Sequence, residues 1–408
     1  MLFQSYMHGV ALDIRATSSG PANTGDAMPA AVAGLVAMAA AIGTGRFVYT
    51  PILPAMIGAL GLSRSAAGLI ASANFLGYLI GALLAAIPSL PGSRRHWLLG
   101  ALAVSAATTA GMGVRENLPS FLALRFAGGV ASAFVLIIAS TLVLERLAEA
   151  GRSALSALHF AGVGIGVAAS AALVAALLAE GEPWQSLWIA SGALSFVATV
   201  AVAWLLPDHP APARGATRTD GGSTGRLRRL VAAYGLFGFG YVITATFLVT
   251  IVRNTPAIRS LEPVIWVVFG LAAAPSVVLW NRIASRLGIP ASFALASLVE
   301  AGGVVASVAS TAAAGVFAAA VLVGGTFMGL TALGLVQARA LATGDPRRAL
   351  ALMTFAFGLG QIIGPAFAGI VADRTGSFTA PSTVAVIALL LAAILAGTLA
   401  LARPAEVS

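Results

Sequence analysis

Residues 43–54 of the chain read GTGRFVYTPILP and place an arginine, Arg46, inside a long apolar stretch. The fourteen residues before it, PAAVAGLVAMAAAI, carry no charge, and another apolar run follows at 66–87. On insertion scales, an arginine near the centre of a membrane helix costs about 2.5–3.5 kcal/mol. A residue kept in place against this cost is expected to have a specific role, so Arg46 is the first candidate for a functional residue.

The composition is that of a membrane protein. Of the 408 residues, 59% are hydrophobic and only 9% are charged, whereas soluble domains carry about 25% charged residues. A water-soluble core could not bury this much apolar surface. We therefore expect a protein that crosses the lipid bilayer many times.

Missing residue types exclude several kinds of chemistry. The chain has no cysteine, which excludes disulfides, thiolate metal sites and cysteine nucleophiles. It has no lysine either, so it lacks the lysine of a phosphate-binding loop, and no cluster of His, Asp and Glu has the spacing of metal ligands. We expect no enzymatic activity, no cofactor and no metal site.

Apolar runs separated by turn-rich breaks predict twelve membrane-spanning helices, because the hydrocarbon core requires about 20 apolar residues per helix. The expected spans are 30–57, 66–87, 97–114, 119–144, 154–179, 185–206, 230–252, 264–284, 291–310, 312–341, 349–372 and 380–402. The longest polar break divides them into two sets of six. The predicted parts of the chain are a polar tail at 1–28, an N-terminal half at 29–206, a cytoplasmic linker at 207–229, a C-terminal half at 230–403 and a tail at 404–408.

The arginines predict the orientation. With both termini in the cytoplasm, sixteen arginines fall on the cytoplasmic side, five on the other side, and two, Arg46 and Arg125, within spans. Short cytoplasmic loops of membrane proteins carry such an excess. We expect a multi-pass protein of the cytoplasmic membrane with both termini inside. The same loops account for the net charge of +9 without a nucleic-acid partner.

Glycine-containing motifs recur at a nearly constant offset along the chain. The pairs are AGGV at 127–130 with VGGT at 323–326, GVG at 162–164 with GLG at 358–360, and GTG at 43–45 with GFG at 238–240. The offsets are 196, 196 and 195 residues. They indicate a duplicated six-helix half, as in many transporters. Small residues also mark helix contacts where there is no duplication, so both interpretations remain open.

Several motifs together resemble a known family. GTGRFVYTPILP at 43–54, followed by ASANFLGYLIGAL at 71–83, resembles the YbfB/YjiJ-like branch of the major facilitator superfamily. RFAGGVASA at 125–133 resembles the Arg-x-x-x-Gly motif of that superfamily, which is implicated in proton coupling. GVGIG at 162–166 resembles its glycine-rich antiporter motif without the proline, and GLGQIIGP at 358–365 resembles the counterpart with the proline.

The resemblance implies an all-α membrane fold of twelve helices in two pseudo-symmetric six-helix halves. Spans 1, 4, 7 and 10 are then expected to line a central cavity, spans 2, 5, 8 and 11 to form the moving interface, and spans 3, 6, 9 and 12 to face lipid. One departure is the loop SLPGSRRH at 89–96, which lacks the acidic residue usual in the family. This departure concerns the charged contact between helix ends that the resemblance implies, and it does not affect the expected fold.

Polar residues on the expected cavity helices are candidates for binding the solute. These candidates are Arg46, Tyr49 and Thr50 on the first span and Tyr241 and Thr244 on the seventh. Tyr241 occupies the position of Arg46 in the repeat. In a second interpretation, Arg46 donates hydrogen bonds to carbonyls near Pro51 and Pro54 and fixes a bend in the helix.

Five further residues are candidates for coupling or gating: Arg125, His159, Asn74, Gln361 and Glu300. Arg125 matches the fourth-span motif, but its position also allows it to snorkel to the membrane surface. His159 is interpreted either as a titratable gate or as a packing residue at a helix end. Glu300 is either a proton carrier or a neutral acid bonded to a neighbouring helix. The amides Asn74 and Gln361 are of a type that more often joins helices than binds a solute.

Small residues at the expected moving interface allow helices to approach closely. The interface glycines are expected to be Gly162, Gly164, Gly166, Gly358, Gly360 and Gly364.

The expected cavity helices contain two arginines and no mid-span carboxylate, whereas exporters of cationic drugs usually need acidic groups inside. We therefore expect a monomeric secondary active transporter that moves a small organic anion or amphiphile by alternating access, coupled to protons. Two alternatives remain. One is a multidrug efflux antiporter, which the glycine-rich fifth span favours, and the other is a membrane sensor or assembly partner that does not transport.

Overall fold

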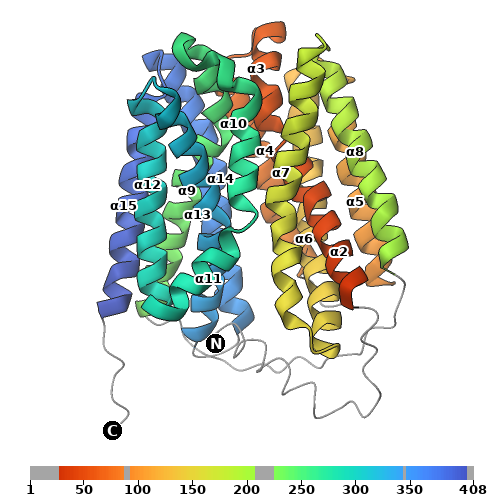
Figure 1. Cartoon of the computed structure of the whole chain (residues 1–408), viewed down its shortest axis with the longest axis vertical. Coiled ribbons are helices and arrows are strands. Elements are labelled where there is room, and N and C mark those ends of the chain that lie inside the picture. Colours follow the sequence, from red (N-terminus) through yellow and green to blue (C-terminus); the bar gives the residue numbers. More distant parts are fainter. Residues whose placement is uncertain (1–26, 87–91, 207–224, 343–345, 402–408) are drawn as a thin grey trace. The chain divides into compact units, whose positions relative to one another are not determined.

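The computed structural model describes residues 27–86, 92–206, 225–342 and 346–401, and in these ranges the chain forms helices and no strand (Figure 1). In the first half of the sequence the elements are α2 (Ala27–Met38), η2 (Ala39–Thr44), α3 (Tyr49–Leu60), α4 (Arg64–Ala85), α5 (Arg94–Gly111), α6 (Leu118–Glu149), η3 (Ser153–Leu155), α7 (Ser156–Ala179) and α8 (Trp184–Leu205). In the second half they are α9 (Gly225–Asn254), η4 (Pro256–Leu261), α10 (Glu262–Ala273), α11 (Ser276–Leu287), α12 (Ile289–Ala309), α13 (Ala313–Ala340), α14 (Pro346–Thr375) and α15 (Thr379–Leu401).

Several helix ends follow local sequence signals. Asn117 precedes α6, and its side chain accepts a hydrogen bond from the Ser120 N–H, while Pro119 lies in the first turn, where no intrahelical N–H bond is needed. Ser93 caps α5 in the same way. α3 ends at Leu60, and Gly61 after it has a φ of 62°, in the left-handed region that glycine adopts readily.

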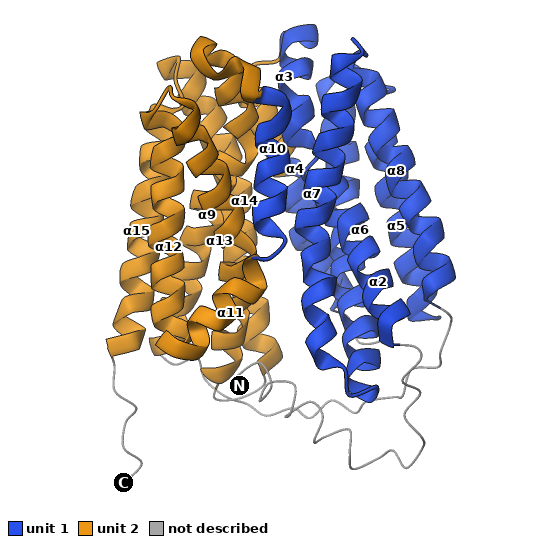
Figure 2. Cartoon of the chain, in the orientation of Figure 1, with its two compact units in different colours: residues 1–61, 73–211, 262–275 blue, residues 62–72, 212–261, 276–408 orange. Residues whose placement is uncertain are grey.

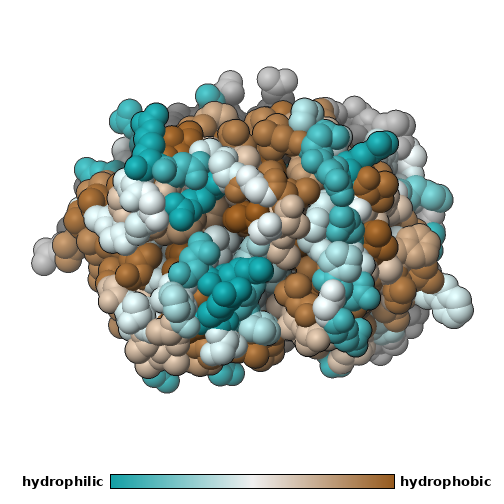
Figure 3. Space-filling model, turned by 90° about the horizontal axis from the view of Figure 1, so that it is seen from above, coloured by the Kyte–Doolittle hydropathy of each residue, from teal (hydrophilic) through white to brown (hydrophobic). Residues whose placement is uncertain are grey.

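The predicted all-helical membrane architecture is confirmed. Eleven of the described helical segments are long and apolar enough to cross a membrane. The remaining expected span corresponds to α5, which has 18 residues and is made less apolar by Arg94, Arg95 and His96 at its start. In the end-on view of Figure 3, hydrophilic residues form separate clusters among hydrophobic ones.

The eighth expected span, 264–284, is not one continuous helix. α10 ends at Ala273 and α11 begins at Ser276. Pro275 lies between them and has no N–H to continue the hydrogen-bond ladder, so the interruption follows from the sequence.

The chain divides into two compact units whose members are not simply the two halves of the sequence (Figure 2). Unit 1 comprises residues 1–61, 73–211 and 262–275, and therefore includes α10. Unit 2 comprises residues 62–72, 212–261 and 276–408, and therefore includes the first turns of α4. The predicted tails and linker lie largely outside the described residues, although α9 already begins at Gly225, inside the predicted linker.

Within unit 1, α7 packs against α2, η2 and α10, while α5 packs against α6 and α8. An apolar core joins α2, η2, α5, α6 and α8, with Leu98, Leu102, Val135, Ile138 and Val202 among its buried side chains. The turn that contains the first candidate residues follows η2 directly.

Within unit 2, α9 packs against α14 and α15, and α12 packs against α13 and α15. The start of α4 belongs to this unit and is capped by α14. Asp373 accepts hydrogen bonds from the main-chain N–H groups of Arg64 at 3.0 Å and Ser65 at 2.8 Å, and also from the Ser65 hydroxyl. A carboxylate at a helix N-terminus accepts hydrogen bonds from the free N–H groups and interacts favourably with the helix dipole.

Candidate functional site

The first expected span is interrupted between η2 and α3. Residues 45–48 form turns, and regular α-helix resumes at Tyr49. Pro51 lies in the first turn of α3, where its missing N–H is tolerated, whereas Pro54 lies further inside the helix. Buried carbonyls at such an interruption need donors from other parts of the chain.

Arg125 of α6 supplies two of these donors. Its Nη1 donates to the carbonyl oxygen of Gly45 and its Nη2 to that of Arg46, each at 2.9 Å. The planar guanidinium can reach two acceptors at once, which an ammonium group cannot do with the same geometry. Arg125 is only 5% exposed, and its Cζ lies 5.2 Å from the ring centroid of Tyr49. Its contacts are therefore directed into unit 1 and not to the membrane surface.

A third donor comes from α10. Nε1 of Trp266 donates to the carbonyl oxygen of Phe47 at 3.1 Å, and the Thr50 N–H also donates to this oxygen at 3.3 Å. Trp266 is fully buried and stacks on Phe269, with ring centroids 4.2 Å apart. Side chains from two other helices thus hold three successive carbonyls of the turn.

The side chain of Arg46 lies against aromatic rings of α4. Its Cζ is 4.1 Å from the ring centroid of Tyr78 and 4.8 Å from that of Phe75. Stacking a guanidinium over aromatic faces is favourable, more so where water is excluded, and Arg46 is 7% exposed. The ordinary cost of burying this charge is therefore partly offset by the two rings.

Asn74 connects α4 to the same cluster. Its Nδ2 donates to the carbonyl oxygen of Arg125 at 2.9 Å. α4 and α6 approach closely here, since a Cβ added at Gly129 would lie 2.0 Å from the carbonyl oxygen of Asn74, and one at Gly77 would lie 2.0 Å from that of Phe126. Asn74, Arg125, the 45–48 turn and the Arg46 side chain form one contact network, which we call the arginine cluster.

His159 lies elsewhere in unit 1, between α7, α6 and α2. Its Nε2 is 3.0 Å from the hydroxyl of Ser140, and its ring packs edge-on against Phe160. A Cβ at Gly34 would lie 2.5 Å from Nδ1, so α2 can pass close to the imidazole only because position 34 is glycine. His159 is completely buried and joins three helices.

The α7 glycines approach other helices on two faces. An added Cβ would lie 2.2 Å from the Leu35 carbonyl oxygen at Gly162 and 2.3 Å from that of Ala39 at Gly166, both on the face toward α2 and η2. At Gly164 it would lie 2.3 Å from the main-chain nitrogen of Ala274, just after α10. No side chain larger than hydrogen fits these positions without a shift of backbone.

The corresponding positions of unit 2 lie between α14 and α9. An added Cβ at Gly360 would lie 2.3 Å from the Gly235 carbonyl oxygen, and one at Gly364 would lie 2.6 Å from the Val242 side chain. Gly358 is buried on the same helix. Glycine thus permits close backbone approach between α14 and α9, as it does between α7 and the first span.

Tyr241, the repeat counterpart of Arg46, lies in an aromatic cluster of unit 2. Its ring is stacked on those of Phe237, Phe327 and Phe357 at centroid distances of 5.2, 5.7 and 5.8 Å. Nε2 of Gln361 donates to its hydroxyl, which connects α14 to α9. An aromatic residue thus takes the place that the cationic side chain has in unit 1.

Two further polar residues of unit 2 are fully buried. Thr244 lies one turn beyond Tyr241, and its hydroxyl has no hydrogen-bond partner among the described residues. Glu300 of α12 accepts a hydrogen bond from the Thr326 hydroxyl on α13 at 3.1 Å, while its Oε2 has no partner in the described ranges. Glu300 is therefore directed toward α13, an expected cavity helix.

The structure brings Arg46, Tyr49, Asn74 and Arg125 together in unit 1. It brings Tyr241 and Gln361 together in unit 2. His159 and Glu300 each lie apart from these clusters, and no group of three His, Asp or Glu within the described residues could hold a metal ion.

Sequence reasoning did not single out Tyr78, Phe75, Trp266, Ser140 and Thr326 as partners. Phe75 and Tyr78 fall in the quoted motif at 71–83, which was an available signal. The others lie in ordinary apolar helices, where a tryptophan or a hydroxyl residue does not stand out.

Comparisons with known proteins agree on the kind of protein. The sequence profile of a family described as "Uncharacterised MFS-type transporter YbfB" matches residues 38–397. A search of curated proteins gives no match. Among solved structures, a mutant of the nucleoside transporter NupG is similar with a TM-score of 0.71 and 15% identity, covering 90% of this chain and 98% of its own. A bacterial homolog of the human lysosomal transporter Spinster, in an inward-facing and occupied conformation, has a TM-score of 0.65 and 13% identity, covering 94% and 96%.

Proposed function

Because the chain belongs to the YbfB-like family of major facilitator transporters, we propose that it moves a small organic anion or amphiphile across the membrane by alternating access. Its family consists of transporters and not of enzymes. The proposed location is the cytoplasmic membrane, with both termini in the cytoplasm, as the arginine distribution favours. The nucleosides named for one solved structure are not transferred to this chain, because 15% identity supports a shared fold alone.

One observation carries the choice of an anionic solute. Among the described residues of unit 1, the buried charged side chains are two arginines, Arg46 and Arg125, with no buried carboxylate. A cationic solute would meet repulsion there, whereas a carboxylate, phosphate or sulfonate would gain charge-assisted hydrogen bonds.

The two arginines are proposed to contribute differently. Arg125 already uses two donors on main-chain carbonyls, so its part is to hold the turn in place. The Arg46 guanidinium lies over the rings of Tyr78 and Phe75 beside this turn, and it is the proposed solute-binding group. Tyr49 and Thr50, which follow it, are the further proposed solute-binding groups of unit 1. Tyr241 and Thr244 are the proposed solute-binding groups of unit 2.

Proton coupling is proposed to pass through Glu300. Its buried carboxyl has one hydrogen bond, from Thr326, and a second oxygen with no partner among the described residues. Carboxyl groups within membrane helices are typical members of proton relays. His159 and the arginine cluster are the other proposed participants in coupling and gating.

Binding of the solute can be tested by titrating the purified protein with a panel of small organic acids and organic cations, using intrinsic fluorescence as the readout. Arg46→Gln removes the guanidinium together with its stacking on Tyr78 and Phe75, while the Arg125 bond goes to the main chain of residue 46. We expect acids to bind the wild type and to bind Arg46→Gln about tenfold or more weakly, the effect of losing a charge-assisted hydrogen bond. Arg115→Gln, an exposed arginine, is the matched control and should bind as the wild type does.

The alternatives give different results in the same assay. Organic cations that bind wild type and Arg46→Gln equally would overturn the anion proposal in favour of multidrug efflux. Solute binding without uptake into proteoliposomes would instead indicate a sensor or assembly partner.

Coupling requires a separate measurement in proteoliposomes. Glu300→Gln keeps the shape of the side chain and an acceptor for Thr326 but cannot carry a proton. We expect it to lose accumulation driven by a pH gradient while retaining exchange of solute for solute. Unchanged pH-driven accumulation would remove Glu300 from the coupling path.

A further inference from the structure

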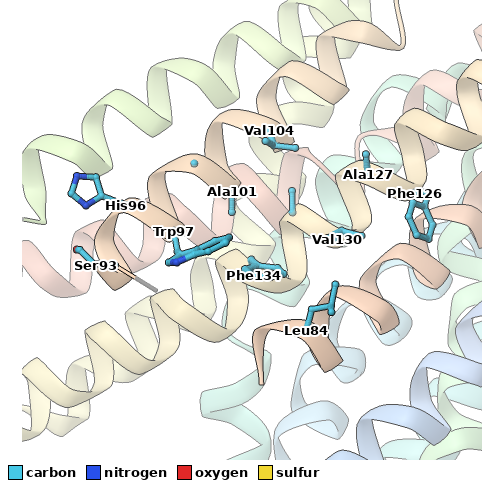
Figure 4. A pocket seen from close by; sticks show the side chains of 13 residues that line it. Leu84, Ser93, His96, Trp97, Ala101, Val104, Phe126, Ala127, Val130 and Phe134 are labelled. Carbon is cyan, nitrogen blue, oxygen red and sulfur yellow. The ribbon is translucent and has the colours of Figure 1, made fainter. Parts of the chain in front are cut away.

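A groove of about 790 Å³ opens on unit 1 between α4, α5 and α6 (Figure 4). Its lining residues are Leu84, Gly92, Ser93, His96, Trp97, Gly100, Ala101, Val104, Phe126, Ala127, Val130, Ala131 and Phe134. All except Ser93 and His96 are apolar or glycine. The arginine cluster contributes none of these residues, so the groove is separate from the proposed solute site.

The length of the groove matches one leaflet of a bilayer. From Ser93 to Val104 it follows α5 for about 16 Å at the helical rise of 1.5 Å per residue. Half of the hydrocarbon core is about 15 Å thick. Glycine and alanine residues along this length leave room in the groove. Trp97 and Phe134, with ring centroids 5.6 Å apart, form a stacked pair near its polar end. A lipid acyl chain fits both the length and the apolar lining.

The polar end of the groove favours an anion. α5 begins there, with exposed Arg94 and His96 in its first turn and no acidic residue in that turn. A helix N-terminus attracts negative charge, so basic residues in the first turn are locally unfavourable unless an anion lies beside them. Arg94 reaches Glu145 at 3.2 Å, but its side chain remains 43% exposed and accessible to a further partner.

We propose that this groove binds one anionic phospholipid, with an acyl chain along α5 and α6 and the phosphate at the first turn of α5 beside Arg94 and His96. The charge of Arg94 at the polar end distinguishes this occupant from a zwitterionic lipid, which would gain less from it. It also distinguishes it from a second copy of this chain, whose apolar helix would leave the basic end unmatched.

Two exposed tryptophans provide a fluorescent reporter, Trp97, and a control, Trp204. Of its six tryptophans, Trp97 and Trp204 are 37% and 85% exposed, whereas the other four are at most 4% exposed. Trp204 lies at a similar depth, since Arg95 in the first turn of α5 donates to the Ala203 carbonyl oxygen at 2.7 Å, but it is outside the groove. In Trp204→Phe, Trp97 is therefore the exposed tryptophan that lipid can quench, and in Trp97→Phe it is Trp204.

The test is fluorescence quenching of the full chain in nanodiscs that contain brominated phosphatidylglycerol or brominated phosphatidylcholine. We expect Trp97 to be quenched at a mole fraction of the anionic lipid about fivefold lower than that of the zwitterionic lipid, the effect of one arginine at the membrane surface. Trp204 should respond equally to the two lipids. Arg94→Gln combined with His96→Gln should remove the preference at Trp97 and leave quenching by both lipids.

Filling the groove gives a second, independent variant. A Cβ at Gly100 meets no atom within 4 Å, so the side chain of Gly100→Leu can occupy the groove without a backbone clash at its Cβ. Gly302→Leu, at an equally open position on α12, is the matched control. We expect Gly100→Leu to remove the lipid preference and Gly302→Leu to keep it. Equal quenching of Trp97 by both lipids in the wild type would overturn the proposal. Protection of Trp97 from both lipids in a dimeric protein would overturn it too, in favour of a second copy in the groove.

Discussion

Nη2 of Arg125 lies 2.9 Å from the carbonyl oxygen of Arg46, so one buried arginine holds the main chain of the other. The second bond of Arg125 goes to the Gly45 carbonyl, and its guanidinium therefore spans the turn between η2 and α3. The side chain of Arg46 takes no part in these two bonds and extends over the ring of Tyr78. Holding the turn and binding a solute are thus assigned to different atoms, and the two roles can be tested separately.

Arg125→Lys is expected to lower the apparent unfolding temperature in detergent, followed by tryptophan fluorescence. A lysine ammonium cannot satisfy both carbonyls in the same geometry, and a buried carbonyl left without a donor costs about 1–3 kcal/mol. Arg115→Lys changes an exposed arginine and serves as the control. Equal unfolding temperatures for the two variants would contradict the role assigned to Arg125.

Trp266→Phe is expected to destabilise the protein less than Arg125→Lys. The Phe47 carbonyl would lose the indole donor but would keep the Thr50 N–H, so the hydrogen-bond contribution is about 0.5–1.5 kcal/mol. The same unfolding assay measures the order of the two variants, with Trp204→Phe as the exposed control. The reverse order would mean that the α10 donor is the main support of the turn.

Gly166→Ala is expected to separate α7 from η2. The added methyl group would lie 2.3 Å from the Ala39 carbonyl oxygen, and overpacking of this kind costs about 1–3 kcal/mol. Gly302→Ala places a methyl group where no atom lies within 4 Å, so its unfolding temperature should be unchanged or slightly higher. A loss of stability in both variants would point to a general effect of replacing helical glycine, not to this contact.

The contact between Gln361 and Tyr241 is suited to a double-mutant cycle. Tyr241→Phe and Gln361→Leu each leave a buried polar partner, which costs about 1–3 kcal/mol. The double variant should be less destabilised than the sum of the two, because both partners are then removed. Additive losses in unfolding free energy would show that the two side chains stabilise the protein independently.

The capping contact between α14 and the start of α4 tests alternating access. The chain has no cysteine, so Ser65→Cys with Asp373→Cys creates the only two thiols, at positions whose native side chains are in contact. If the contact opens during transport, a short bifunctional thiol reagent should stop solute uptake, and each single cysteine variant should remain active. Full activity of the bridged protein would mean that this contact stays closed throughout the cycle.

Much of the architecture was predictable because hydrophobicity acts locally. The apolar runs located the helices to within a few residues, and the cost of burying Arg46 marked the region where the first span is interrupted. The sequence predicted one continuous span at 30–57, with a bend near Pro51 and Pro54 only as a second interpretation, whereas the irregular turn precedes both prolines, at 45–48. The prolines are compatible with the restart of the helix, and side chains of other helices hold the turn.

The partners of the candidate residues were harder to predict, because they are far apart in sequence. Arg125 was singled out, but nothing local indicates that its acceptors are carbonyls 79 and 80 residues earlier. Trp266 carries no signal at all in an apolar helix. The break between α10 and α11 could have been found, since Pro275 interrupts an otherwise apolar run.

The membership of α10 in unit 1 has a consequence for how the protein is made. Unit 1 is drawn from residues 1–61, 73–211 and 262–275, so a ribosome that has completed the first six spans has not yet produced all of it. The indole that donates to Phe47 emerges only after α9 has been synthesised. The newly synthesised N-terminal half therefore lacks this donor at first. Unit 1 is complete only when a segment encoded beyond the midpoint of the gene has been added.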